Sequence, residues 1–362
     1  MMSSPNPGPP TITQADDALQ HGPRPLPLFL NLLWRETEGD LPLRETAFRG
    51  LARYQYVPRP PPVQAPPSIA AAGPARLLHH GGGGDRVPTV FIPSLINPPS
   101  ILDLSPARSM LRNMAAARHD IYMVDWGVPS ADDATLDLAG HVTQRLVPLL
   151  ARFPRPPILI GYCLGGTLAI GAASVMPVHA LATLAAPWHF DRLAPEDRAA
   201  VARLWEGAQP TCARLGYVPM ELLQAGFWAL DPKRTVRKYA AFADVKAGSE
   251  EERAFLAVED WANAGPPLSY AAGRDLFERL YAGNETGAGS WAVGSKRVNP
   301  TALALPTLSV VSTADRIVPA AIAPPLADSR SIDLGHVGMV VSARARAALW
   351  EPLSCWLSQQ GG

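Results

Sequence analysis

From about Ala75 onward, short apolar runs alternate with longer stretches in which apolar residues recur every three or four positions. Short apolar runs are typical of buried strands, and the longer pattern is typical of amphipathic helices. Their alternation predicts an α/β fold with a mostly parallel, doubly wound sheet covered by helices on both faces. The seven predicted strands begin at Ala75, Pro88, Asp120, Pro157, His179, Pro306 and Ser329.

The alternation is interrupted between residues 187 and 301, where several helical patterns stand between two predicted strands. We interpret this segment as a helical lid or cap, so the core comprises residues 75–186 and 302–362. Residues 1–74 differ from both parts, because 15 of the 39 prolines fall in the first 75 residues. Proline-rich composition favours extended chain, and we expect a partly disordered arm there.

One segment of the arm, residues 28–39, has the pattern of an amphipathic helix. Such a helix either packs on its own protein or leaves an apolar face exposed as a docking surface for a partner or a hydrophobic surface. Packing on its own protein is the more common case for such a helix, and both interpretations stay open at this point.

Charge and cysteine content limit the possible function classes. Thirty-two basic residues balance 32 acidic ones, so the chain lacks the positive charge typical of nucleic-acid binding. The three cysteines are too scattered for a disulfide framework or a CxxC metal site, and this usage favours the cytoplasm. We also expect no secretory signal and no transmembrane segment, because the first residues and the apolar runs lack the required pattern.

Cys163 has the most informative surroundings. It follows a predicted strand and precedes a helical pattern, with Gly161 on one side and Gly165 and Gly166 on the other. This is the layout of a nucleophile elbow in an α/β-hydrolase fold, with cysteine in place of serine. The alternative is a buried thiol in a tight turn, which explains the apolar flanks but not the three glycines.

A nucleophile in this fold needs an acid and then a histidine, in that chain order. Asp315 directly follows a late predicted strand, and His336 lies in a glycine-flanked loop before the last helical pattern. We therefore predict a Cys163–His336–Asp315 triad. Asp333 is a weaker candidate for the acid, because three residues leave little room to fold back onto His336. The alternative roles are a helix-cap or turn residue for Asp315 and a turn histidine for His336.

An oxyanion hole in this fold combines two main-chain N–H groups. The first is predicted to come from Leu164, which follows the nucleophile. The second is predicted to come from Ile96 or its neighbour Leu95, in the loop after the strand that begins at Pro88.

Several segments together resemble the polyhydroxyalkanoate synthases, particularly the short type whose catalytic subunit works with a separate accessory subunit. They are PTVFIPSLINPPSILDLSPARS, DIYMVDWGVPSADDATLDL, GYCLGG, GYVPMELLQAGFWALDP, STADRIVP and GHVGMVVS, and the similarity covers roughly residues 75–358. A GYCLGG-like turn also occurs in dienelactone hydrolase. Asp315 comes 152 positions after Cys163, however, and this spacing requires a large lid that compact lactone hydrolases lack.

The resemblance implies that Cys163 takes the acyl chain of a 3-hydroxyacyl-CoA as a thioester. It further implies that His336 deprotonates Cys163, and that Asp315 orients His336 and helps to activate the attacking 3-hydroxyl group. Arg316 stands where the synthases have a histidine after the acid. No metal or redox cofactor is implied. The implied partners are an accessory subunit or a second copy of the chain, and the surface of a polymer granule.

Two other functions stay open from the sequence. One is a hydrolase with the same triad, acting on a thioester, a lactone or a polymer ester. The other is a granule-associated or regulatory protein that keeps the fold without turnover. The residues do not determine the length of the acyl chain.

Overall fold

The structure is a computed structural model that describes residues 22–60, 65–83 and 85–361. These residues form two compact units. The sheet unit comprises the described residues between 65 and 230 together with 264–361, and the helical unit comprises residues 22–60 and 231–263.

The sheet unit is organised around an eight-stranded sheet in the order β1-β2-β6-β3-β7-β8-β13-β14. The strands are β1 (Ser68–Ala72), β2 (Ala75–Gly81), β3 (Thr89–Ile92), β6 (Ile121–Asp125), β7 (Ile158–Tyr162), β8 (Ala180–Leu184), β13 (Thr307–Ser312) and β14 (Asp328–Ile332). β1 pairs with β2 and β2 with β6 in antiparallel fashion, and the other pairs are parallel. All seven predicted strands are therefore present, and the doubly wound α/β prediction is confirmed.

Strand β1 was not predicted. Its sequence, SIAAA, has few of the β-branched and aromatic residues that mark strands, and we had assigned it to the arm that ends at residue 74. It forms through a tight hairpin with β2, at which Gly73 has a φ of 61°. The ordered part of the sheet unit thus begins before the predicted boundary.

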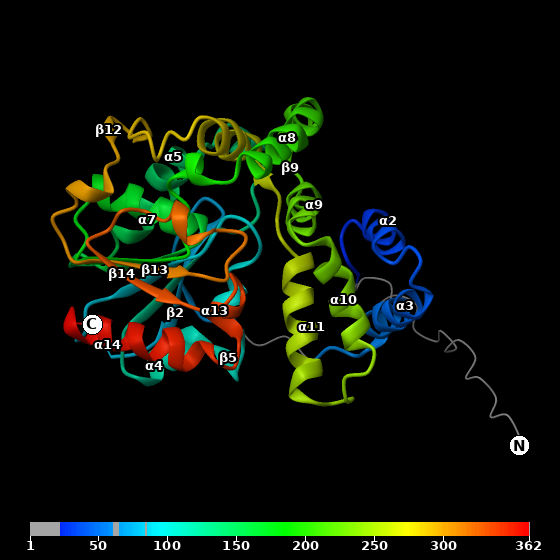
Figure 1. The fold of residues 1–362 in the computed structure, drawn as a ribbon. Helices are drawn as coiled ribbons and strands as arrows, with labels where there is room; N and C mark the ends of the chain where they lie inside the picture. Colours follow the sequence, from blue (N-terminus) through cyan, green and yellow to red (C-terminus); the bar gives the residue numbers. More distant parts are fainter. Residues whose placement is uncertain (1–21, 61–64, 84, 362) are drawn as a thin grey trace, which may run out of the picture. The chain divides into compact units, whose positions relative to one another are not determined.

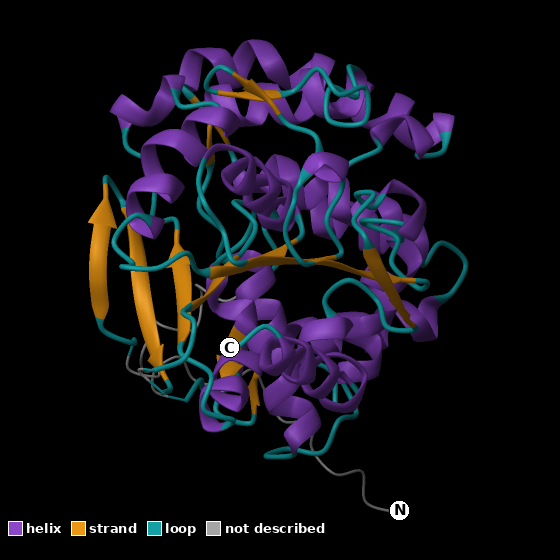
Figure 2. Ribbon diagram, turned by 90° about the vertical axis from the view of Figure 1, so that its left-hand side faces the viewer, coloured by secondary structure: helices purple, strands orange, loops and turns teal. Residues whose placement is uncertain are grey.

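Helices cover both faces of the sheet, as Figures 1 and 2 show. On one face, α7 (Leu164–Val175) packs against β7 and β8 and against the helical segment α5 (Leu138–Gly140), η3 (His141–Leu146) and α6 (Val147–Leu150). The other face carries α4 (Met110–Ala116) and α14 (Glu351–Gln359), which follows η8 (Arg346–Trp350). Shorter elements are η1 (Pro99–Leu102), β4 (Asp103–Ser105), β5 (Arg108–Ser109), η2 (Ala131–Thr135), η4 (Phe190–Arg192), η6 (Pro300–Ala302), η7 (Ala320–Ile322) and α13 (Gly338–Val341).

The segment between β8 and β13 supplies a helical cap, as predicted for a lid between late strands. Within the sheet unit it contains α8 (Pro195–Leu215), α9 (Met220–Leu230), α12 (Tyr270–Arg274) and η5 (Asp275–Ala282). It also contains two short antiparallel pairs, β9 (Tyr217–Val218) with β10 (Leu268–Ser269) and β11 (Ala292–Val293) with β12 (Lys296–Arg297).

The helical unit joins two segments that are far apart in the sequence. Helices α2 (Leu26–Glu36) and α3 (Leu41–Tyr56) pack with α10 (Pro232–Phe242), and α11 (Glu250–Asn263) completes the unit. The contact is close: a Cβ atom at Gly50 would lie 1.8 Å from the carbonyl oxygen of Tyr239. Partly buried polar contacts reinforce it, since Arg53 bonds Glu252 and the Tyr54 hydroxyl donates to Asp260 at 2.7 Å.

This arrangement corrects the predicted domain organisation. Residues 231–263 were assigned to the lid, and residues 22–60 to a partly disordered arm, but the two segments fold together. The prolines of the arm were misleading because Pro27 and Pro42 occupy first-turn helix positions, where proline is well tolerated. The predicted helix over residues 28–39 corresponds to α2, which buries Phe29, Leu32 and Leu33. The rest of the arm prediction, over residues 1–21 and 61–64, lies outside the described residues.

Within the described residues, none of the helices combines the length and the apolar character that crossing a bilayer requires.

Candidate active site

Cys163 lies at the sharp turn between β7 and α7, at the carboxyl edge of the sheet. Its backbone has φ 55° and ψ −132°, a conformation that a non-glycine residue rarely adopts. Its N–H donates to the carbonyl of Leu184, at the end of the neighbouring strand β8, at 2.9 Å. Strained backbone of this kind is concentrated at functional sites, where the surrounding structure holds it in place.

The three glycines around Cys163 are there because the turn has no room for side chains. A Cβ atom at Gly161 would lie 2.3 Å from the Cα of Gly166, and one at Gly166 would lie 2.4 Å from the Cβ of Ala186. A Cβ atom at Gly165 would lie 2.1 Å from the carbonyl oxygen of Ile92. The glycines therefore let β7, α7 and the loop after β3 approach one another at van der Waals distance.

His336 and Asp315, 21 positions apart in the chain, form a direct hydrogen bond. Nδ1 of His336 lies 2.6 Å from Oδ2 of Asp315, and the two side chains are 9% and 0% exposed. The other carboxylate oxygen, Oδ1, accepts the N–H groups of Ile317 at 2.8 Å and Val318 at 2.9 Å. The carboxylate thus keeps its hydrogen-bond partners in a fully buried position.

Asp333, the weaker candidate for the acid, lies elsewhere. Its side chain is exposed, and its Oδ1 atom accepts from the Thr313 hydroxyl at 3.5 Å. The structure therefore brings Asp315, and not Asp333, to the imidazole.

The same imidazole lies within interaction range of Cys163, so one ring faces both the sulfur and the carboxylate. Burial by itself would lower the pKa of His336, but the negative charge of Cys163 and the hydrogen bonds with Asp315 and Cys163 outweigh it and raise the pKa to about 10. A base with a raised pKa beside the sulfur is suited to take the proton of Cys163. A thiolate is the nucleophilic form of cysteine.

The two predicted oxyanion donors differ in their surroundings. Leu164 is the first residue of α7, where N–H groups have no acceptor within the helix. The N–H of Ile96 instead donates to the Ser94 hydroxyl at 3.0 Å, within its own loop. This differs from the expectation that the Ile96 N–H points at an oxyanion. Its neighbour Leu95 is the other position that the sequence left open.

Tyr281 on η5 is a polar group of the cap that sequence reasoning missed. Burial, followed by the negative charges of Cys163 and Asp197, raises the pKa of Tyr281 to about 12. Its phenol therefore stays protonated at neutral pH, within electrostatic range of the sulfur. No motif identifies this residue in the sequence, because its position depends on how the cap helices pack.

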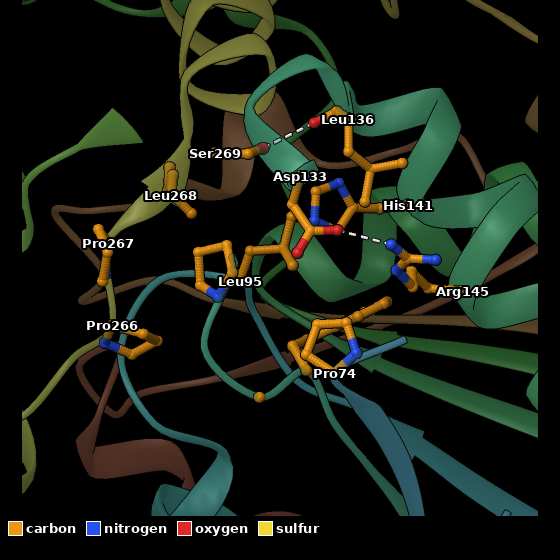
Figure 3. Close-up of a pocket in the computed structure, with 13 residues that line it drawn as sticks. Pro74, Leu95, Asp133, Leu136, His141, Arg145, Pro266, Pro267, Leu268 and Ser269 are labelled. Atoms are coloured by element: carbon orange, nitrogen blue, oxygen red, sulfur yellow. Dashed lines mark hydrogen bonds and ion pairs between the residues drawn. The ribbon is translucent and has the colours of Figure 1, made fainter. Parts of the chain in front are cut away.

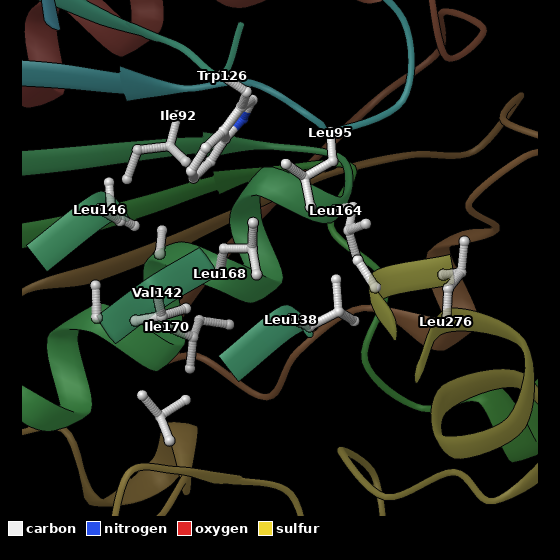
Figure 4. Close-up of a cluster of buried hydrophobic side chains, with 14 of the residues drawn as sticks. Ile92, Leu95, Trp126, Leu138, Val142, Leu146, Leu164, Leu168, Ile170 and Leu276 are labelled. Atoms are coloured by element: carbon white, nitrogen blue, oxygen red, sulfur yellow. The ribbon is translucent and has the colours of Figure 1, made fainter. Parts of the chain in front are cut away.

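A cavity of about 30 Å³ lies beside the loop after β3, and Leu95 is part of its wall (Figure 3). Its polar wall contains the ion pair between Arg145 and Asp133, at 2.6 Å, and His141, whose pKa is lowered by burial. The space suits about one water molecule. Leu95 also belongs to the buried cluster that includes Leu164 (Figure 4).

Comparison with known proteins assigns the fold. A family model described as the alpha/beta hydrolase family matches residues 77–349. The chain belongs to the alpha/beta hydrolase family. Among solved structures of similar fold is a thermophilic esterase from Thermogutta terrifontis, with a TM-score of 0.49 and 13% identity over 83% of this chain and 99% of that chain.

The curated relatives confirm the predicted resemblance. "Poly(3-hydroxyalkanoate) polymerase subunit PhaC" of Haloferax mediterranei is 31% identical, covering 79% of this chain and 62% of the relative. The protein of the same name from Haloarcula marismortui is 29% identical, covering 76% of this chain and 62% of the relative. That from Synechocystis sp. is 26% identical, with coverages of 76% and 78%. The chain thus spans 62% of the length of the first two of these relatives.

Proposed function

We propose that this protein is an acyltransferase that polymerises 3-hydroxyacyl-CoA into polyhydroxyalkanoate through a thioester on Cys163, with release of CoA. The observation that carries the proposal is the convergence of Cys163, at the strained turn after β7, with the His336–Asp315 pair, whose imidazole lies within interaction range of the sulfur. The curated relatives, all named as polymerase subunits, support the choice of substrate.

In the first step Cys163 gives its proton to His336, and its sulfur attacks the thioester carbonyl of the substrate. The Leu164 N–H would stabilise the oxyanion that forms, and such a donor typically contributes about 2.7–4 kcal/mol to lowering the barrier. The bond between the carbonyl carbon and the CoA sulfur then breaks. His336 gives its proton to that sulfur, which leaves as CoA thiol.

In the second step the 3-hydroxyl group of another hydroxyacyl unit attacks the acyl group on Cys163. His336, now neutral, accepts the hydroxyl proton while Asp315 fixes the orientation of its ring. The carbon–sulfur bond to Cys163 breaks, an ester bond forms, and the sulfur is negative again beside a protonated His336. These steps use no metal or redox cofactor.

Cysteine suits this sequence of steps chemically. A thiolate exchanges readily with the thioester of a CoA substrate, and the acyl-enzyme thioester stays reactive toward a hydroxyl group. If water replaced the hydroxyl group, the same residues would perform hydrolysis. The alternative function is therefore distinguished by the product rather than by the triad.

The test uses purified protein with 3-hydroxybutyryl-CoA, following thiol release and product mass together. We expect CoA release and oligomeric esters from the wild type, and neither from Cys163→Ala. The matched control is Cys355→Ala, which removes an exposed thiol of α14 and should leave both signals unchanged.

Two outcomes would overturn the proposal. Normal CoA release by Cys163→Ala would exclude the thioester on that sulfur, and free hydroxyacid without oligomers would favour hydrolysis.

Since the relatives are named as subunits, we also propose that activity involves an accessory subunit or a second copy of the chain, acting at a polymer granule surface. Mass measurement of the native protein in solution, alone and with a candidate accessory subunit, tests the assembly.

A further inference from the structure

Tyr162, the last residue of β7, contacts the candidate base His336 in two ways. Its hydroxyl donates a hydrogen bond to the main-chain carbonyl of His336 at 3.1 Å. Its ring also stacks on the imidazole, with centroids 5.1 Å apart and an interplanar angle of 27°. The tyrosine thus touches both the backbone and the side chain of the residue that it faces.

The hydrogen bond acts at a point where the histidine loop turns into α13. The carbonyl of Gly335 accepts the N–H of Met339 at 2.8 Å, and the carbonyl of Val337 accepts the N–H of Val341 at 3.2 Å. The carbonyl between them is the one that the Tyr162 hydroxyl reaches. A side chain from the central strand β7 therefore fixes the peptide that carries the imidazole.

The hydroxyl can keep this role over a wide pH range. Burial raises the pKa of Tyr162 well above its ordinary value, and the negative charges of Cys163 and Asp315 raise it further. The phenol consequently remains a donor while the groups around it change charge.

We infer that Tyr162 is a positioning residue for His336, so that the end of β7 carries both the nucleophile and the support of its base. Asp315 binds Nδ1 at the edge of the imidazole. Tyr162 stacks on the face of the ring and donates to the main-chain carbonyl of His336. Because Tyr162 and Cys163 are consecutive, one strand end sets the distance between the sulfur and the ring. The inference rests on the proposed role of His336 in the reaction.

The test compares Tyr162→Phe, which removes only the hydroxyl, with Tyr162→Leu, which also removes the stacked ring. The matched control is Tyr122→Phe. Tyr122 stacks on His79 with centroids 4.6 Å apart, and its hydroxyl donates to Asp120 at 3.1 Å. The same chemical group is therefore removed from a similar tyrosine–histidine pair in another part of the sheet.

Three quantities are measured: the pKa of His336 by NMR of labelled histidine, the rate of Cys163 alkylation by iodoacetamide at pH 7, and kcat and KM for CoA release. We expect the pKa of His336 and the alkylation rate to fall in Tyr162→Phe. We also expect kcat to fall roughly tenfold with little change in KM. The loss should reach about a hundredfold in Tyr162→Leu, since a small misplacement of a catalytic group costs on that order.

The melting temperatures of the variants show whether a loss of activity comes from a displaced His336 or from an unfolded protein. A Tyr162→Phe variant that keeps the wild-type pKa of His336, alkylation rate and kcat would overturn the inference. So would equal losses in Tyr122→Phe. If the wild type releases no CoA, the proposed function fails, but the pKa and alkylation measurements still decide the role of Tyr162.

Discussion

Asp315 binds His336 with one carboxylate oxygen, at 2.6 Å from Nδ1, while its other oxygen accepts two main-chain N–H groups of the turn that follows. Both oxygens are thus held by short contacts in a fully buried position. The carboxylate can therefore fix the orientation of the imidazole before any substrate arrives, which is the function of the third residue of a nucleophilic triad.

Asp315→Asn should reduce kcat for CoA release by about 10⁴-fold, the loss typical of a triad carboxylate replaced by its amide. It should also lower the pKa of His336, because the bond to the carboxylate is one of the effects that raise it. Kinetics and NMR titration measure the two effects. Asp333→Asn is the control, since that exposed carboxylate lies near the imidazole in the sequence only. Equal losses in both variants would contradict the assignment.

Cys163→Ala should lower the pKa of His336 from its value of about 10, because the negative charge of Cys163 is the strongest of the effects that raise it. A folded-state pKa above the ordinary 6.5 means that protonated His336 stabilises the folded protein. This contribution is complete below about pH 6.5 and is lost as the pH rises toward 10. Urea unfolding at several pH values should show that decline in the wild type and a smaller one in Cys163→Ala. Identical pH profiles would argue against the charged pair.

Gly165→Ala should destabilise the elbow, because the added methyl group would lie 2.1 Å from the carbonyl oxygen of Ile92. Overpacking of this kind typically costs about 1–3 kcal/mol. The control is Gly207→Ala on α8, where no atom lies within 4 Å and the backbone is helical. We expect that change to be neutral or to stabilise by up to about 1 kcal/mol. Chemical denaturation measures both, and a stable, active Gly165→Ala variant would disprove the close packing.

Glu252→Ala should loosen the helical unit. Glu252 is buried on α11 and pairs with Arg53 of α3 at 2.5 Å, so its removal leaves a partly buried guanidinium without that carboxylate. We expect a loss of about 1–3 kcal/mol in the stability of this unit. Glu251→Ala, at the exposed neighbouring position, should change it by less than about 0.5 kcal/mol. Hydrogen exchange of the α11 amides measures the difference. Equal protection in both variants would contradict a stabilising role for the pair of Arg53 and Glu252.

The sheet and the chain order of the candidate triad could be predicted from the sequence more fully than the other parts of the molecule. Buried parallel strands are short apolar runs, and the turn at Cys163 needs glycines at particular positions, so both features are local in the sequence. The pairing of α3 with α10 was missed because it depends on contacts between segments almost 200 residues apart, such as that of the Arg53 guanidinium with the carbonyl of Phe242.

Two site features were beyond sequence reasoning for a similar reason. The direction of the Ile96 N–H depends on the rotamer of Ser94 and on the shape of one loop. The contact of Tyr162 with His336 depends on where a distant loop crosses the end of β7. The sequence places Tyr162 next to the nucleophile, but it gives no indication of which residue the ring faces.

The helical unit has a practical consequence for anyone who shortens this chain. Residues 22–60 pack against apolar side chains of residues 231–263, so deleting residues 22–60 would expose apolar surface on an internal segment. Loss of activity in such a variant would therefore report damage to the packing of residues 231–263.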